Sequence, residues 1–359
     1  MPQGLDKLTI KGFKSIKSLE DFELKNLNVL IGGNGAGKSN FVEFFQFMKA
    51  MMAENLASYV MNLGGCDDLL FNGPQTTPRL EVELYFNKDI NYTCVMRPTN
   101  GEKFIIENEI YPAHDMFGGF ETSLLEVKED KSHPDWVTCE ELYQLISGFS
   151  VYHFHETGAT APMRRSEIIQ DNHRLRFNAS NIAPFLHNLC DTHKDAYQQI
   201  TNTIQLVCPF FDKFVFEPVG DKQKVNLSWR QRGSDYPLQP YHFSDGTIRF
   251  ICLTTALLQP TFPSTIILDE PELGLHPFAI EILAELIEAA SRHTQVIIST
   301  QSPLLVDCFS AEDIIVVNRK NGASCFERLN QNDLSSWLED YSLGELWRKN
   351  VINGSPTHE

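Results

Sequence analysis

A glycine-rich segment near the N-terminus has the residue types and spacing of a phosphate-binding loop. It matches the pattern G-x-x-x-x-G-K-S/T and consists of Gly32, Gly33, Asn34, Gly35, Ala36, Gly37, Lys38 and Ser39. In such a loop, successive backbone N–H groups surround an anion, and glycines let phosphate oxygens approach the backbone. The lysine then reaches the β- and γ-phosphates of a nucleotide, and the serine hydroxyl binds Mg²⁺. The alternative interpretation is a glycine turn without a ligand.

A phosphate loop of this kind needs a strand before it and a helix after it. The apolar run at residues 27–31 predicts the strand, and residues 40–52 predict a helix with one aromatic side. Both elements are where the motif requires them, which favours nucleotide binding. We interpret Phe44, Phe45 and Phe47 as core residues rather than as a platform for stacking a base.

Two adjacent carboxylates follow a second apolar run, at residues 266–268. A strand that ends in two acids can place one of them in the coordination shell of Mg²⁺ and the other beside an attacking water molecule. We therefore assign Asp269 as the metal ligand and Glu270 as the general base. The alternative is a strand that ends in solvated acids.

The adjacent Asp and Glu resemble the second motif of ABC-type ATPases, and within them of the SMC, RecF and OLD-like group. The opening residues 8–15, LTIKGFKS, the Asn40 that follows the loop serine, and the segment DEPELGLHP at 269–277 are similar to that group. Compact, stand-alone ATPases described as AAA-family or OLD-like are similar over further segments. The resemblance implies ATP and Mg²⁺ as cofactors and ATP hydrolysis as the activity.

The residues Ser244-Asp245-Gly246-Thr247 resemble the family's signature motif in a shortened form. In the family, this motif comes from a second protomer and closes over the γ-phosphate, so the resemblance implies that Ser244 and Gly246 contact a nucleotide bound by a partner copy. Ser244 also precedes a predicted helix, and the simpler interpretation is a helix N-cap.

The sequence departs from the family in several places. Gln301 stands where many members have a switch histidine. Its amide can hydrogen-bond phosphate or water but cannot carry a proton, which predicts slow turnover.

The glutamine that the family has between core and arm is not evident, and residues 151–157 are the nearest candidate. There, His153 and His155 alternate along a predicted strand, and we interpret them as ordinary histidines rather than metal ligands. Neither a long coiled coil nor a TOPRIM nuclease domain is evident.

From residue 241 onward, short apolar strands alternate with amphipathic helices, a pattern typical of a parallel sheet covered on both faces. The predicted fold class is α/β, a P-loop NTPase core of ABC-ATPase type with a mixed or parallel sheet, interrupted by a smaller α+β arm. The predicted parts are 1–85 with the phosphate loop, 86–240 as the arm, and 241–359 with the signature, the acidic motif and a C-terminal tail.

The composition limits the partners. The 359 residues include 30 Lys and Arg against 47 Asp and Glu, a net charge of −17, so the surface as a whole repels nucleic acid and anionic lipid. DNA binding would need a local basic patch, and pairing of its residues with carboxylates is the interpretation we favour. The candidate residues are Lys11, Lys14, Lys17, Arg164, Arg165, Arg174, Arg176, Arg230 and Arg232.

The sequence also predicts a cytoplasmic protein without a membrane segment. No apolar run approaches the roughly 18 residues of a spanning helix, and the N-terminal residues lack a signal-peptide core. The eight cysteines are scattered without a CxxC pair, which is typical of a reducing compartment.

By resemblance, the leading hypothesis is an ATP-driven switch that forms a head-to-tail homodimer or a higher oligomer. The switch would regulate a separate effector protein, such as a nuclease, or act as its sensor in bacterial anti-phage defence. The alternative is a RecF-like DNA-repair or recombination ATPase that binds DNA directly. The shortened signature disfavours a transporter subunit, and no acceptor site for a kinase is visible. The effector, the trigger and the partner of the arm stay open.

Overall fold

The computed structural model describes residues 4–86, 90–99, 103–111, 114–116, 119, 122–219, 223–352 and 354. The chain divides into two units. The first comprises Met1–Val151, Pro263–Ile267 and Ser291–Glu359, and the second comprises Tyr152–Phe262 and Leu268–Ala290. The phosphate loop and Gln301 therefore belong to the first unit, whereas the two acids and the signature-like residues belong to the second.

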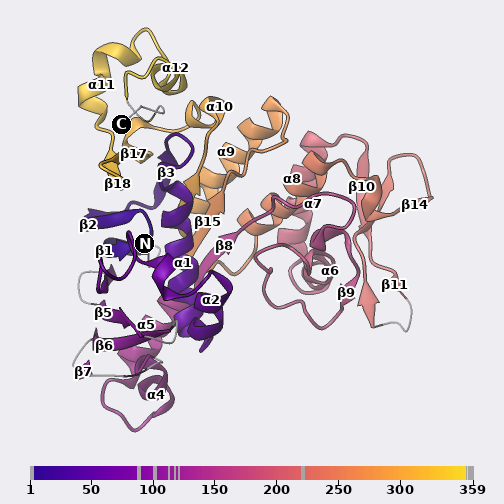
Figure 1. The fold of residues 1–359 in the computed structure, drawn as a ribbon. Coiled ribbons are helices and arrows are strands. Elements are labelled where there is room, and N and C mark those ends of the chain that lie inside the picture. The colour runs from indigo at the N-terminus through magenta and orange to yellow at the C-terminus, as the bar shows by residue number, and fades with distance from the viewer. Residues whose placement is uncertain are drawn as a thin grey trace. The chain divides into compact units, whose positions relative to one another are not determined.

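A six-stranded mixed sheet leads into the phosphate loop, and it belongs to the first unit except for the last residues of β8 and β15 (Figure 1). Its strand order is β18-β17-β3-β16-β15-β8, in which β3 pairs in parallel with β16 and β17, and β17 pairs antiparallel with β18. Every residue of β3 is buried, as expected for an inner strand of a sheet covered on both faces. The strands are β3 (Leu27–Ile31), β8 (Phe149–Tyr152), β15 (Thr265–Asp269), β16 (Gln295–Ser299), β17 (Ile314–Lys320) and β18 (Ala323–Arg328).

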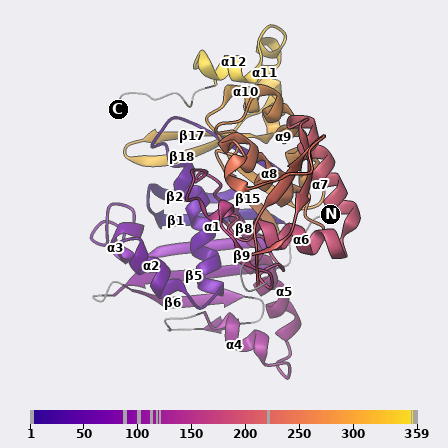
Figure 2. The same ribbon diagram turned by 90° about the vertical axis from the view of Figure 1, so that its right-hand side faces the viewer.

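A second six-stranded sheet in the first unit is antiparallel and has the order β2-β1-β4-β5-β6-β7 (Figure 2). Buried and half-buried residues alternate along β4, so one face of this sheet contributes to the core. The strands are β1 (Leu5–Phe13), β2 (Ile16–Glu23), β4 (Leu80–Phe86), β5 (Ile90–Pro98), β6 (Phe104–Tyr111) and β7 (His114–Met116).

The helix that follows the phosphate loop is central to the core of the first unit. Phe44, Phe45 and Phe47 are fully buried there, and the ring centroids of Phe45 and Phe149 lie 5.1 Å apart, which confirms their predicted role in the core. The helices of this unit are α1 (Lys38–Met52), α2 (Leu56–Asn62), α3 (Cys66–Leu69), α4 (Leu124–Glu129), α5 (Trp136–Ser147), α10 (Pro303–Val306), the 3₁₀ turn η3 (Ala311–Asp313), α11 (Gln331–Leu338) and α12 (Leu343–Arg348).

The second unit is built around one buried helix. Every residue of α8 from position 248 to 257 is buried, and α7 packs beside it (Figure 1). The helices and 3₁₀ turns are η1 (Pro162–Arg164), α6 (Ile182–Thr192), α7 (Lys194–Val207), η2 (Pro240–His242), α8 (Asp245–Leu257) and α9 (Pro277–Ser291). Two small sheets, β10-β13-β14 and β11-β12-β9, contain β9 (Glu167–Ile168), β10 (Phe211–Val215), β11 (Pro218–Val219), β12 (Lys224–Val225), β13 (Ser228–Gln231) and β14 (Pro237–Leu238).

The predicted α/β class and mixed sheet are confirmed, and the strand and helix on either side of the phosphate loop lie within two residues of their predicted bounds. One local prediction is wrong. β8 ends at Tyr152, so His153 and His155 lie beyond the strand on which they were predicted. The predicted boundaries at 85 and 240 mark an arm inserted into an ATPase core, and they stay a prediction. The two units divide the chain at other positions.

In the described part of the chain, no helix combines the length and the apolar character needed to cross a bilayer.

Candidate functional site

The phosphate loop connects β3 to α1 in the first unit. Gly37 is the N-cap residue of α1, with a φ of +113°, and no side chain caps the helix. The N-terminus of this 15-residue helix therefore presents backbone N–H groups and the positive end of the helix dipole to the loop. Asn34, Gly35 and Ser39 are exposed, so a ligand can reach the outer side of the loop.

Two glycines are required because the loop backbone passes very close to its neighbours. A Cβ atom at Gly32 would overlap the carbonyl oxygen of Val317 in β17, and one at Gly37 would overlap the hydroxyl of Ser324 in β18. By contrast, a Cβ at Gly35 would meet nothing, although its φ of +77° still favours glycine. Glycine at positions 32 and 37 is thus needed for the fold of the loop itself, as well as for the approach of a ligand.

Lys38 reaches back along the loop. Its Nζ donates hydrogen bonds to the carbonyl oxygens of Gly32, at 2.6 Å, and Gly33, at 3.3 Å, and the residue is only 5% exposed. A buried ammonium group needs such acceptors, since an unpaired buried charge is strongly destabilising. This arrangement holds a positive charge against the loop backbone, next to the N–H groups at the start of α1, and both features suit a phosphate.

A chain of hydroxyl and amide groups fixes the outer side of the loop. Asn40 Nδ2 donates to Ser15 Oγ at 2.6 Å, the Oγ atoms of Ser15 and Ser324 are 2.7 Å apart, and Ser324 Oγ donates to the carbonyl of Ala36 at 2.6 Å. The loop is thereby joined to the turn between β1 and β2 and to the β17–β18 hairpin. The sequence motif identifies Asn40 but gives no signal for Ser324, which lies 288 residues from Ala36.

An open polar pocket of about 310 Å³ adjoins this chain of groups. Its charged side chains carry both signs, and Lys14 is paired with Glu43 at 2.6 Å. The residues that line the pocket are Lys14, Ser15, Asn40, Asp68, Leu70, Phe71, Asn72, Arg319 and Gly322. A polar part of a ligand held by the phosphate loop could occupy this pocket.

The two acids lie together in the second unit, where Asp269 ends β15. The buried Oδ1 atom of Asp269 has no hydrogen-bond partner among the residues that the structure describes, a costly arrangement unless a ligand such as a cation binds it. Glu270 has a φ of +43°, a left-handed conformation that is strained for a residue other than glycine and that is typical of functional sites. A cavity of about 10 Å³, the size of one water molecule or ion, is lined by both acids.

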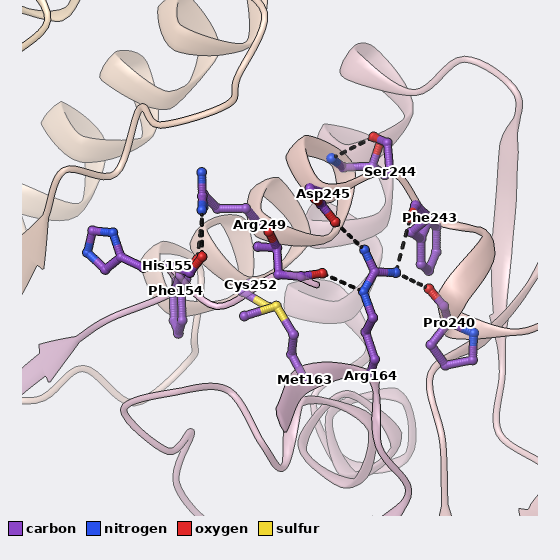
Figure 3. A network of polar contacts seen from close by, with 12 residues as sticks. Phe154, His155, Met163, Arg164, Pro240, Phe243, Ser244, Asp245, Arg249 and Cys252 are labelled. Carbon is purple, nitrogen blue, oxygen red and sulfur yellow. Dashed lines mark hydrogen bonds and ion pairs between the residues drawn. The ribbon is translucent and has the colours of Figure 1, made fainter. Parts of the chain in front are cut away.

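Arg249 holds the segment of Phe154 and His155, as Figure 3 shows, and also the turn that follows the acids. From α8, its Nε donates to the carbonyl of Phe154 at 2.8 Å, its Nη2 donates to the carbonyl of His155 at 3.0 Å, and its Nη1 donates to the carbonyl of Leu273. Burial lowers the pKa of the Arg249 guanidinium from its ordinary value. The group nevertheless keeps its positive charge, because a guanidinium is not deprotonated in proteins.

The signature-like residues begin α8. Ser244 is its N-cap, and its Oγ accepts a hydrogen bond from the backbone N–H of Thr247 at 3.1 Å, so the simpler interpretation of this serine is correct for the isolated chain. Ser244 and Asp245 are both exposed. A Cβ atom at Gly246 would overlap the carbonyl oxygen of Gly274, so glycine is needed where α8 meets the turn that follows the acids. The predicted contact of Ser244 and Gly246 with a partner's nucleotide stays a prediction.

Arg164, one of the basic residues, is structural (Figure 3). Its side chain is 5% exposed and donates to the carbonyls of Thr157 at 2.7 Å, Pro240 at 2.6 Å and Phe243 at 3.0 Å, and it pairs with Asp245 at 2.9 Å. Arg164 therefore holds the backbone that precedes Ser244 and is not available to DNA. Four further basic residues pair with carboxylates, as the favoured interpretation predicts, in Lys11–Glu20, Lys14–Glu43, Arg176–Asp171 and Arg230–Asp235.

The structure thus places the predicted residues in two groups, each within one unit. The first group is the phosphate loop with Lys38, Ser39 and Asn40, and the second contains Ser244, Gly246, Asp269 and Glu270. Gln301 follows β16 in the first unit and is exposed. Ser324 and Arg249 position the site without a signal in the sequence, and the two histidines lie beyond the strand that the sequence predicts for them.

Two family models match the chain. Residues 4–141 match a model described as "AAA ATPase domain", and residues 141–307 match one described as "AAA domain, putative AbiEii toxin, Type IV TA system". The two matches together include the phosphate loop, the signature-like residues and both acids. No curated protein sequence shows significant similarity to the chain.

Solved structures of SMC head domains have the same fold. An SMC head bound to the C-winged helix domain of ScpA is 16% identical, with a TM-score of 0.63 over 93% of this chain and 99% of that one. An SMC head from Pyrococcus furiosus with the C-terminal domain of ScpA is 15% identical, with a TM-score of 0.59 over 94% and 99% of the two chains. The SMC head domain from Thermotoga maritima is 15% identical, with a TM-score of 0.50 over 91% and 100%.

Replacing Arg164 by alanine should destabilise the second unit by about 3 kcal/mol, because three carbonyls and Asp245 lose a charged donor in a buried place. Arg165→Ala is the matched control, since Arg165 is an exposed neighbour that donates only to the carbonyl of Thr160 among the contacts described. Urea unfolding followed by circular dichroism measures both variants. Equal stability of the two variants would contradict the structural role of Arg164.

Proposed function

Because the chain is an ABC-type AAA ATPase of the SMC/RecF-like group, we propose that it is an Mg²⁺-dependent switch that ATP closes into a head-to-tail homodimer and that regulates a separate effector protein. Binding and hydrolysis of ATP follow from its family. The observation that carries the proposal is the phosphate loop, in which the buried Lys38 at the start of α1 donates to two loop carbonyls.

In this proposal, the phosphate loop binds the triphosphate of ATP. The backbone N–H groups at the start of α1 donate to phosphate oxygens, and Lys38 exchanges its contacts with the carbonyls of Gly32 and Gly33 for the β- and γ-phosphates. The chain of groups through Asn40, Ser15 and Ser324 holds the loop in shape, so little ordering is needed when ATP binds. The adjoining polar pocket would accept a part of the nucleotide beyond the phosphates.

The donor atoms of two of the predicted residues are of the kind that Mg²⁺ prefers. Ser39 offers an exposed hydroxyl, and Asp269 offers a buried carboxylate oxygen without a hydrogen-bond partner among the described residues. We assign these two residues as its protein ligands, and the bound ion would neutralise charge that develops on the β- and γ-phosphates. Glu270 would accept the proton of the attacking water. Gln301 would orient that water or a phosphate oxygen through its amide, and turnover is slow because an amide cannot carry the proton.

The proposed dimer uses the exposed start of α8. Ser244 would turn its hydroxyl from Thr247 to the γ-phosphate held by the partner, and the free N–H groups at this helix end favour an anion. The large side chains of Tyr241 and Leu273, close in sequence to Ser244 and Gly274, are exposed and suit an interface. Two chains of net charge −17 repel each other, which makes association depend on the contacts that ATP adds.

We further propose that the effector is a protein, such as a nuclease, in bacterial defence. The family model described as a putative AbiEii toxin supports a role in defence, and the two SMC heads bound to ScpA domains support a protein partner. The RecF-like alternative needs a basic surface for DNA, and no observation favours it, because Arg164 is buried and Lys11, Lys14 and Arg176 pair with carboxylates.

Replacing Lys38 by alanine should abolish ATP binding, because the loop loses its only side-chain charge and the carbonyls of Gly32 and Gly33 lose a donor. Fluorescent ATP titration should show at least about a hundredfold weaker binding, which corresponds to roughly 2.7 kcal/mol. Lys49→Ala, which removes a lysine from the last turn of the same helix, is the control. Wild-type affinity in the Lys38 variant would contradict the proposed phosphate site.

Replacing Glu270 by glutamine should preserve ATP binding and reduce hydrolysis by at least about a hundredfold, because the amide cannot accept the proton of water. The variant should accumulate as a dimer in ATP and Mg²⁺, measured by light scattering during size-exclusion chromatography. Glu272→Gln is the control, because it removes one negative charge two residues away, as Glu270→Gln does at position 270. Hydrolysis at the wild-type rate in Glu270→Gln would exclude Glu270 as the base.

The same Glu270→Gln protein serves to find the effector. It is tagged, expressed in its native cells and recovered in ATP and Mg²⁺, with and without nuclease treatment, and bound proteins are identified by mass spectrometry. A stoichiometric nuclease or toxin-like protein that stays bound after the treatment would support a defence complex. Recovery of DNA alone would favour the RecF-like alternative.

A further inference from the structure

Two histidines lie beside Asp269, and the proposed ATPase cycle does not use them. His153 and His155 belong to the segment that follows β8, and Asp269 ends β15. One ligand atom from each of the three residues lies within 4.8 Å of the other two. Within the described ranges, this is the only group of three or more His, Cys, Asp or Glu residues with such spacing. All three residues belong to the second unit, so their arrangement is a property of that unit alone.

The geometry is close to that of a metal site. His153 Nδ1 is 4.0 Å from Asp269 Oδ2, and the two imidazole rings are 5.8 Å apart between centroids and inclined by 37°. Ligands of a tetrahedral ion with bonds of about 2.0–2.2 Å are about 3.3–3.6 Å apart. Small side-chain rotations would therefore bring the three atoms to ligand distances. His153 and Asp269 are partly exposed, at 29% and 14% of their side chains, so an ion can enter from solvent.

The backbone that carries the histidines is held in place. Arg249 donates to the carbonyls of Phe154 and His155. The side chain of Phe154, the residue between the two histidines, is buried. The same guanidinium donates to the carbonyl of Leu273 in the turn that follows the acids. Both sides of the group are thus fixed by one buried residue, the kind of support that orients metal ligands.

The ligand types indicate which ion fits. Mg²⁺ prefers oxygen ligands, whereas imidazole nitrogen favours first-row transition metals such as Mn²⁺, Co²⁺ and Zn²⁺. Two histidines and one carboxylate also leave coordination positions open for water. The Oδ1 atom of Asp269, buried and without a hydrogen-bond partner in the described part of the chain, would be satisfied by a bound cation.

We propose that His153, His155 and Asp269 bind one divalent first-row transition-metal ion, in the absence of nucleotide. The proposal goes beyond the ATPase function, because its ligands lie in one unit and the phosphate loop supplies none of them. Asp269 is also the residue that we assign to Mg²⁺. A tightly bound Zn²⁺ would therefore compete with Mg²⁺ for this carboxylate, and the ion content would affect hydrolysis.

Cobalt titration tests the site without nucleotide. The full chain, with its affinity tag removed, is titrated with Co²⁺, and the visible d–d absorption bands report binding by nitrogen and oxygen ligands. We expect one Co²⁺ per chain, and at least about tenfold weaker binding in His153→Ala and in His155→Ala. His173→Ala, which removes an exposed histidine from the same unit, should bind like the wild type. Unchanged affinity in both His153 and His155 variants would overturn the proposal.

Two further variants separate this result from folding and from the ATPase proposal. Asp269→Asn keeps the size of the side chain and should also lose Co²⁺, while circular dichroism and thermal unfolding verify that each variant is folded. Lys38→Ala should keep the Co²⁺ spectrum, because Lys38 belongs to the other unit. Loss of Co²⁺ binding in Lys38→Ala, or thiolate-to-cobalt charge-transfer bands in the near ultraviolet, would place the ion elsewhere and overturn the proposal.

Discussion

The backbone of the phosphate loop passes so close to the β17–β18 hairpin that glycine is required at two of its positions. Gly32 packs against the carbonyl oxygen of Val317, and Gly37 packs against the hydroxyl of Ser324, so that neither position has room for a Cβ atom. This contact fixes where β3 ends and where α1 begins, and therefore where the helix presents its N–H groups. The buried charge of Lys38 donates to the loop carbonyls, and a bound anion would offer it a further acceptor. Phosphate binding thus depends on a packing constraint between segments that are far apart in sequence.

The second unit depends in a comparable way on two buried arginines. Arg249 joins α8 to the histidine segment and to the turn that follows Asp269 and Glu270, while Arg164 joins the backbone before Ser244 to the segment at Thr157. A guanidinium suits this position because its fork of donors can satisfy several carbonyls at once. In the proposed switch, these contacts would let the acids, the histidines and the start of α8 move as one body.

The sequence predicts the parts of the site whose signal is local. The glycine loop between an apolar strand and a helix, and the acids that end another apolar run, are patterns within about 20 residues, and the structure places their elements as predicted. Contacts between distant segments leave no such pattern. Ser324 gives no sign in the sequence that it reaches Ala36, and Arg164 is indistinguishable from Arg165, although one is buried and the other exposed. The alternation of His153 and His155 predicts a strand, but β8 ends at Tyr152, before either histidine.

The central claim, that each ATP site is completed by a second copy of the chain, can be tested by mixing two inactive variants. Lys38→Ala protein cannot bind ATP but offers Ser244, and Ser244→Arg protein binds ATP but cannot complete a partner's site. A head-to-tail dimer of the two contains one intact site, so an equal mixture should recover about a quarter of wild-type hydrolysis. A mixture that hydrolyses no more ATP than the sum of its two components would contradict the shared site.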